Sequence, residues 1–284
     1  MAAIALALGS SLLWGISDFM GGLKSRTFAA TIVLACTYLT SLTAMAIFIV
    51  ARAEGPPGSE AILAGLGAGL FGIAGLTAFY RALAIGTMSI VAPIASTGVA
   101  LPVLVGLATG DQPGLLRSIG LVAAIAGVVL ASREEPAKGE ANARLQHQSI
   151  VLAIVAGVGF GTYFTLAEVS SQGDVGWALL LSRVAATPFI VAFALLALRR
   201  GARRPGGREL LVIAGIGLID LAANALYNAS TTIGELSTVA VASSLYPVTT
   251  VLLAAALLGE RVRGLQRVGV VVALCGVVAI AAGA

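Results

Sequence analysis

The sequence predicts an all-α polytopic membrane protein, with ten transmembrane helices in two inverted five-helix repeats around a central cavity. Its composition is the first reason, because 58% of the 284 residues are hydrophobic and 11% are charged, against roughly 25% charged in a typical soluble domain. The mean hydropathy is +1.01. The second reason is a series of apolar runs of about 20 residues, the length that a helix needs to cross a bilayer. The third is that the two halves of the chain resemble each other.

Charged residues and segments rich in Gly or Pro divide the chain into candidate helices. The predicted helices span residues 3–23, 28–51, 61–84, 88–108, 115–132, 148–169, 175–198, 209–232, 237–258 and 265–283. The longest polar segment, SREEPAKGEANARLQHQS, falls at the middle of the chain. We therefore divide the chain into a first repeat (1–133), a polar connector (134–147) and a second repeat (148–284).

Matching segments indicate this internal repeat. GTMSIVAPIAS precedes a span ending in GDQPGLLRSIGLVAAIAGVVL, and GELSTVAVASS precedes one ending in GERVRGLQRVGVVVALCGVV, with matching glycines 148 or 149 positions apart. LLWGISDF likewise lies over VGFGTYFT at an offset of 146 positions. An odd number of helices in each repeat inverts the second copy in the membrane. Repeats of this kind place a substrate site at their interface, near the bilayer midplane.

Two glycine clusters predict close helix packing. GLGAGLFGIAG (65–75) and GVGFG (157–161) contain small-xxx-small spacings, which let helix backbones approach closely. Glycine is also simply common in membrane helices, so a purely compositional origin is the alternative, and it carries more weight for the second cluster.

The distribution of basic residues predicts the orientation. The connectors after the odd-numbered helices hold most of them: Lys24, Arg26, Arg81, Arg133, Lys138, Arg144, Arg199, Arg200, Arg203, Arg204, Arg208, Arg261, Arg263 and Arg267. The connectors after the even-numbered helices hold only Arg52 and Arg117. The positive-inside rule then places the odd connectors in the cytoplasm and both termini outside, in the inner (cytoplasmic) membrane.

The sequence resembles the drug/metabolite transporter superfamily, and within it the bacterial EamA type. The resemblance rests on the Trp-Gly pair in LLWGISDF, on FYRALAIGTMSIVAPIAS, and on LYPVTTVLLAAALLGERVRGLQRVGVVVALCGVV near the end. It implies a ten-helix basket with a central cavity that moves small metabolites, amino acids or drugs without ATP. The first copy has GDQPG where the second has GERVRG, so Asp111 stands in for Glu260. The resemblance also implies cytoplasmic termini, opposite to the charge distribution.

Four ionisable side chains lie inside predicted spans: Asp18, Glu168, Arg183 and Asp220. An ionisable group at the bilayer centre costs at least about 2.5 kcal/mol, so those that persist usually face a cavity or a partner. Asp18 and Glu168 lie near span ends, which favours a position at the membrane surface. Arg183 lies further inside, where it would pair with Asp220 or Glu168, or hold a substrate carboxylate.

Asp220 begins a polar stripe. Asn224, Tyr227 and Asn228 follow at i+4, i+7 and i+8, on one face of the helix. We predict that these four residues line the cavity and bind the substrate. Low dielectric favours the neutral form of a carboxyl group, which makes Asp220 a candidate for proton coupling. The alternative is that the stripe joins helices by hydrogen bonds worth about 0.6 kcal/mol each.

Aromatic side chains supply further candidates. Trp14 and Tyr80 lie in the segments that carry the family resemblance, and we predict that they line the cavity. Packing or a place at the lipid interface is the alternative for both, and the favoured explanation for Tyr163 and Tyr246.

Prolines in related helices suggest hinges. Pro93 and Pro247 lie in the fourth and ninth predicted helices, and each removes a helical hydrogen bond. They are hinge candidates, or they only shape the helices.

The sequence holds no catalytic motif. The single histidine, His147, lies in the connector, and HExxH, P-loop and Ser-His patterns are missing, so we predict neither an enzyme nor a requirement for cofactor, metal or ATP. The net charge of +4 reflects topology and not nucleic-acid binding. We predict a secondary active transporter of small organic solutes that works by alternating access, with export favoured. A passive pore and a membrane-embedded lipid-modifying enzyme are the alternatives, and both a monomer and a homodimer fit the sequence.

Overall fold

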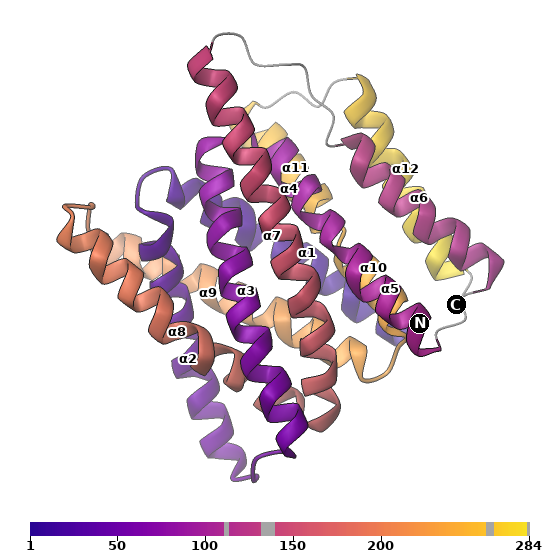
Figure 1. Cartoon of the computed structure of the whole chain (residues 1–284), viewed down its shortest axis with the longest axis horizontal. Coiled ribbons are helices and arrows are strands. Elements are labelled where there is room, and N and C mark those ends of the chain that lie inside the picture. Colours follow the sequence, from indigo (N-terminus) through magenta and orange to yellow (C-terminus); the bar gives the residue numbers. More distant parts are fainter. Residues whose placement is uncertain (111–113, 132–139, 260–263, 283–284) are drawn as a thin grey trace.

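The computed structural model describes residues 1–110, 114–131, 140–259 and 264–282. The first half of the chain contains α1 (Ala2–Ser25), α2 (Ala30–Arg52), α3 (Ser59–Ile85), α4 (Met88–Ser96), the 3-10 turn η1 (Thr97–Val99), α5 (Ala100–Thr109) and α6 (Leu115–Ala131). The second half contains α7 (Glu140–Gly173), α8 (Val175–Arg199), α9 (Gly207–Thr231), α10 (Leu236–Ser243), α11 (Tyr246–Leu258) and α12 (Gly264–Ala282). The described residues contain helices and no strands (Figure 1), so the predicted all-α fold is confirmed.

Eight helical segments of the described residues are long and apolar enough to cross a membrane: Ala2–Ser25, Ala30–Arg52, Ser59–Ile85, Met88–Thr109, Arg144–Gly173, Val175–Arg199, Gly207–Thr231 and Leu236–Leu258. Two further helices, α6 and α12, occupy the fifth and tenth predicted spans. Large apolar side chains point outward, and Ile47, Leu63 and Leu211 are 66% to 75% exposed. A water-soluble surface would rarely gather so many, whereas lipid tails suit them.

Two of the predicted spans are present, but each is made of two α-helices and not of one. Residues 88–108 form α4 and α5 with η1 between them, and residues 237–258 form α10 and α11 with Ser244 and Leu245 between them. Pro247 lies in the first turn of α11, where its missing N–H costs no helical hydrogen bond. Pro93 lies inside α4, one turn before η1. The two breaks therefore lie at equivalent places in the two halves, but the prolines do not.

The helix α7 begins earlier than its predicted start at residue 148. It begins at Glu140, so residues 140–147 are helical although we assigned them to the polar connector. The segment EANARLQ contains neither Gly nor Pro and several good helix formers, and its polarity marks where the membrane span ends but not where the helix ends. Residues 134–139 of the connector lie outside the described residues.

Helices of the two halves pack against one another. α3 lies along α7, α1 along α9, α2 along α8 and α6 along α12 (Figure 1). Where α3 crosses α7, a Cβ atom on Gly159 would lie 2.7 Å from the Cα atom of Gly75. No side chain fits at that distance, so glycine sets the separation of the two helices. The predicted close packing of the two glycine clusters is confirmed.

Polar contacts also join the halves. The Ser41 hydroxyl on α2 donates a hydrogen bond to the Gly217 carbonyl on α9 at 2.9 Å. At the end of α2, Arg52 donates to both carboxylate oxygens of Asp174, at 3.2 and 3.0 Å. Asp174 in turn accepts a hydrogen bond from the Trp177 backbone N–H at 2.7 Å and so caps α8. The Asp174 carboxylate therefore caps α8 of the second half and also binds the end of α2 in the first half.

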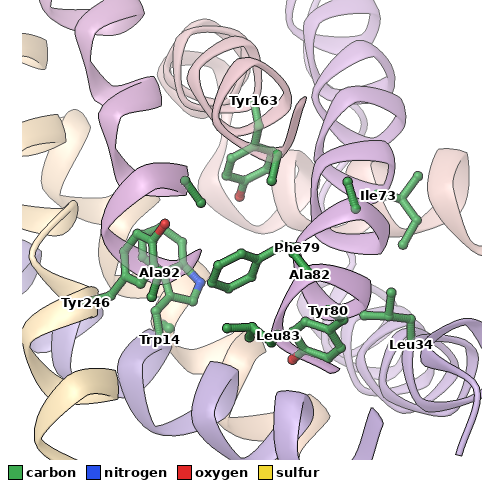
Figure 2. Close-up of a cluster of buried hydrophobic side chains, with 14 of the residues drawn as sticks. Trp14, Leu34, Ile73, Phe79, Tyr80, Ala82, Leu83, Ala92, Tyr163 and Tyr246 are labelled. Carbon is green, nitrogen blue, oxygen red and sulfur yellow. The ribbon is translucent and has the colours of Figure 1, made fainter. Parts of the chain in front are cut away.

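Aromatic rings fill the core between the halves. Phe79 on α3 is fully buried, and its ring centroid lies 5.4 Å from that of Phe160 and 6.1 Å from that of Tyr246, both edge-on. Figure 2 shows Phe79 between Trp14 and Tyr246 on one side and Tyr80 on the other. The edge-on arrangement is one that aromatic rings prefer. These contacts therefore hold α3, α7 and α11 in a defined position relative to each other, beside the central pocket.

Candidate functional site

A pocket lies between the two halves of the chain. It encloses about 470 Å³ of empty space, including the part that opens to the surroundings. The helices α1, α2 and α3 contribute to it from the first half, and α7, α8, α9 and α11 from the second. Its lining residues are Trp14, Asp18, Tyr38, Gly72, Leu76, Phe160, Tyr163, Phe164, Arg183, Asp220, Asn224 and Tyr246. Half of these side chains are aromatic.

An ion pair forms the polar part of the pocket wall. Arg183 on α8 donates through Nη2 to Oδ2 of Asp220 on α9 at 2.9 Å, and the two side chains are 2% and 13% exposed. The guanidinium carbon lies 4.9 Å from the ring centroid of Tyr38, within cation–π range. A buried charge without a partner is strongly destabilising, so Arg183 and Asp220 each offset the cost of burying the other's charge. Of the two partners predicted for Arg183, the structure selects Asp220.

Asn224 connects this ion pair to α7. Its Nδ2 donates to the backbone carbonyl of Asp220 at 2.7 Å, and its Oδ1 accepts a hydrogen bond from the Tyr163 hydroxyl. The turn of α9 that carries Asp220 is thereby held against α7. The two explanations offered for the polar stripe both apply to Asn224, because it lines the pocket and also joins two helices.

Asp18 lies in the pocket wall, and our expectation of a surface position for it is wrong. It is 5% exposed, because α1 continues beyond it to Ser25 and packs here against α3 and α11. Among the described residues, no cation and no hydrogen-bond donor is paired with its carboxylate. Glu168 lies elsewhere, is partly exposed and accepts a hydrogen bond from Gln172 at 3.1 Å.

Three of the predicted site residues do not line this pocket. Tyr227 lies behind Trp14 and Phe164, with ring centroids 5.6 and 4.9 Å away, and its hydroxyl donates to the Phe164 carbonyl at 3.2 Å. Asn228 and Tyr80 are 1% and 2% exposed and lie in the protein interior outside the lining. Four predicted residues are brought together in the pocket: Trp14, Arg183, Asp220 and Asn224.

Sequence reasoning missed much of the wall. It did not single out Tyr38, Gly72, Leu76, Phe160 and Phe164, and it attributed Tyr163 and Tyr246 to packing or the lipid interface. The internal repeat held the missing signal. Four pairs of lining residues occupy equivalent positions in the two halves, 146 or 148 positions apart: Trp14 with Phe160, Asp18 with Phe164, Gly72 with Asp220, and Leu76 with Asn224.

These pairs differ in chemistry. In three of the four, one member is polar and its counterpart is apolar: Asp18 with Phe164, Asp220 with Gly72, and Asn224 with Leu76. Gly72 also leaves room for the Tyr163 ring, which would lie 3.0 Å from a Cβ atom at that position. Equivalent sequence positions in the two halves thus carry different polar groups, which suits a ligand with one polar end.

Metal ligands are not gathered in the part of the chain that the structure describes, since no three His, Cys, Asp or Glu side chains there are grouped closely enough to hold a metal ion. Asp111 and Glu260, the acidic residues that replace each other in the two copies, lie outside the described residues.

Comparisons with known proteins agree with this architecture. A model of the EamA-like transporter family matches residues 1–133 and 147–282. A solved structure described only as "Crystal structure of protein" is similar to the chain, with a TM-score of 0.73, 18% sequence identity and coverage of 98% of both chains; at this identity the likeness concerns the fold alone. No curated protein sequence matches the chain. Because the family model covers nearly the whole length, the chain belongs to the EamA-like transporter family of the drug/metabolite transporter superfamily, and it is a multi-pass membrane transporter.

Proposed function

We propose that the protein is a secondary active transporter that moves a small organic solute through the central pocket by alternating access. The ion pair between Arg183 and Asp220, in a wall to which both halves contribute, carries this proposal. Ionisable groups inside a membrane protein commonly mark substrate or ion pathways. Transporters built from two related halves bind their substrates where the halves meet.

The two halves are proposed to be inverted repeats, with residues 1–133 as the first copy and residues 148–284 as the second. In this repeat α1 corresponds to α7, α2 to α8 and α3 to α9. Exchanging each helix for its counterpart turns the contact of α3 with α7 into that of α9 with α1, and the contact of α3 with α8 into that of α9 with α2. All four contacts are present. A pseudo-two-fold axis between the halves produces this exchange, and rocking about it would open the pocket to either side.

The broken helices are the proposed moving parts. α4 meets α5 at η1, and α10 meets α11 at Ser244 and Leu245. A break interrupts the ladder of helical hydrogen bonds, so the chain bends there at lower cost. Pro93 and Pro247 lie within one turn of these breaks and remain our hinge candidates.

Asp220 is the proposed proton-coupling residue. Protonation of its carboxyl group would remove the charge that holds the Arg183 guanidinium 2.9 Å away. Arg183 would then be free to reorient, because it would lose most of the attraction of the ion pair. A contact between two helices that depends on one proton is a way to link proton binding to a change of conformation.

The proposed location is the inner membrane, with both termini outside and with export as the favoured direction. The excess of Lys and Arg in the connectors after the odd-numbered helices supports the orientation. A single chain forms the whole pocket, so a monomer would suffice for transport, and a homodimer would be an assembly of complete transporters.

Flux into proteoliposomes tests the proposal. The purified chain would be reconstituted and uptake of labelled amines, amino acids and organic acids measured with and without a pH gradient. We expect saturable flux that unlabelled solute competes away. Arg183→Gln should abolish it, whereas Arg203→Gln, at a side chain 65% exposed, should not.

Other outcomes would identify the alternatives. Flux that rises without saturation and is insensitive to Arg183→Gln would indicate a passive pore. A change in the lipid composition of the vesicles, measured by mass spectrometry, would indicate a lipid-modifying enzyme.

A further inference from the structure

The pocket contains one more carboxylate than its cations neutralise. Asp18 and Asp220 both line it, and Arg183 is the lining cation. Arg183 is engaged with Asp220 at 2.9 Å, which leaves Asp18. The Asp18 side chain is buried, with 5% of its surface exposed, and a carboxylate so placed is costly unless something binds it.

Among the described residues, the surroundings of Asp18 supply no positive charge beyond that of Arg183, which Asp220 already engages. The polar groups close enough to act on it electrostatically are the hydroxyls of Tyr80 and Tyr246 and the carboxylate of Asp220. The Tyr80 hydroxyl is directed to the Ser17 carbonyl at 3.5 Å. The Tyr246 hydroxyl is buried without a hydrogen-bond partner in the described residues. The second carboxylate adds to the negative field, so the Asp18 carboxyl group holds a proton unless a ligand brings a positive charge that takes the place of that proton.

The walls beside Asp18 suit the apolar part of such a ligand. Trp14 lies one helical turn before Asp18 and on the same face of α1, and its ring centroid is 5.5 Å from that of Phe164. Phe160 and Leu76 extend this apolar surface. Aromatic faces attract organic cations as well as apolar groups, so the same rings would favour both ends of a ligand that joins an ammonium group to an apolar body.

We propose that the solute moved by this transporter is a small organic cation whose single amine or guanidine group binds Asp18 and whose ring-sized apolar body packs among Trp14, Phe160 and Phe164. The inference rests on the proposed transport function and names its substrate class. A substrate carboxylate is disfavoured, because it would have to compete with Asp220 for Arg183. The asymmetry of the wall, with Asp18 matched by Phe164 in the other half, fits a solute charged at one end.

Calorimetric binding to the purified full-length chain tests this assignment with three probes of one shape. Phenethylamine carries an ammonium group, 2-phenylethanol replaces it with a neutral hydroxyl, and phenylalanine adds a carboxylate. We expect phenethylamine to bind at least about tenfold more tightly than either of the others. The comparison uses the unaltered protein, so it does not depend on whether a variant folds.

Variants then locate the charge. Asp18→Asn should bring phenethylamine and 2-phenylethanol within about twofold of each other while leaving 2-phenylethanol binding unchanged. Asp18→Glu should restore the preference for the amine. Glu60→Gln, at an exposed carboxylate in the first turn of α3, is the matched control and should bind all three probes like the unaltered chain.

Three results would overturn the assignment: equal affinity for amine and alcohol, tighter binding of phenylalanine than of phenethylamine, or no binding of any probe. Uptake by proteoliposomes separates this failure from failure of the proposed function. If the reconstituted chain shows saturable flux of a neutral or acidic solute, the transporter stands and the cation assignment falls. If no solute shows saturable flux, the proposed function itself falls.

Discussion

Asp220 makes several contacts in the pocket wall, through both its side chain and its backbone. Its carboxylate binds Arg183 on the neighbouring α8, its backbone carbonyl accepts a hydrogen bond from Asn224, and it faces the cavity. The Arg183 guanidinium also lies against the Tyr38 ring. Because these contacts connect α2, α8 and α9, a change of charge at Asp220 acts on helices of both halves.

Asp220→Asn removes that charge while keeping the shape of the side chain. We expect proton-coupled uptake to be lost and exchange of solute across the membrane to remain, since the variant has no carboxyl group to carry the proton. Uptake with and without a pH gradient, against counterflow of preloaded solute, measures both. Unchanged dependence on the pH gradient would leave Asp220 with a structural role only.

Loss of folding is the main confounding effect of this substitution. Arg183 would keep a buried charge without its partner, which costs about 3 to 5 kcal/mol of stability. The double variant Arg183→Met with Asp220→Asn removes both charges and should unfold at a higher temperature than Asp220→Asn alone. Exchange that survives in Asp220→Asn itself shows that this variant is folded, so a loss of proton coupling there is not a consequence of unfolding.

Glycine determines how closely the long helices cross. At the crossing of α3 and α7, the close approach of Gly159 to Gly75 leaves no room for a methyl group. Gly215 on α9 has nothing within 4 Å of the position that a Cβ atom would occupy. The two glycines therefore have opposite structural value, although both lie inside helices.

Alanine at these two positions should separate the contributions of packing and helix propensity. Gly159→Ala should lower the unfolding temperature, because it forces α3 and α7 apart; overpacking of this kind costs about 1 to 3 kcal/mol. Gly215→Ala should leave stability unchanged or raise it by up to about 1 kcal/mol, since alanine is the better helix former. Thermal unfolding in one detergent measures both. Equal effects would show that the α3–α7 separation does not depend on glycine.

The orientation of the whole molecule depends on the loops and not on the pocket. The basic connectors predict that a reporter fused after Ala284 lies on the outer side of the inner membrane. Alkaline phosphatase, which is active only there, should therefore be active in such a fusion, and a green fluorescent protein fusion should stay dark. The reverse result would place the termini in the cytoplasm, as the family resemblance implies.

The site could be predicted in part from single residues. Arg183 and Asp220 were recognisable because ionisable groups are costly inside a span, and their pairing was one of three options that the sequence left, beside a pair with Glu168 and a contact with a substrate carboxylate. Asp18 was misplaced because distance from a span end says nothing about what packs against that turn. The aromatic and small residues of the wall, such as Phe160 and Gly72, cost little free energy inside a membrane span, so nothing in the sequence of their own helix singles them out. Only their repeat equivalence to Trp14 and Asp220 points to the pocket.

Composition and the lengths of the apolar runs determine the all-α membrane fold by themselves, because a chain in lipid has to satisfy its backbone groups within each helix. The tertiary structure decides where α4 and α5, and α10 and α11, are separated, since a break is stable only where other helices satisfy the freed backbone groups. It also decides that Asp18 is buried beside the paired Asp220 and Arg183. That arrangement depends on which helices of the two halves meet, and the sequence of one helix does not specify its neighbour.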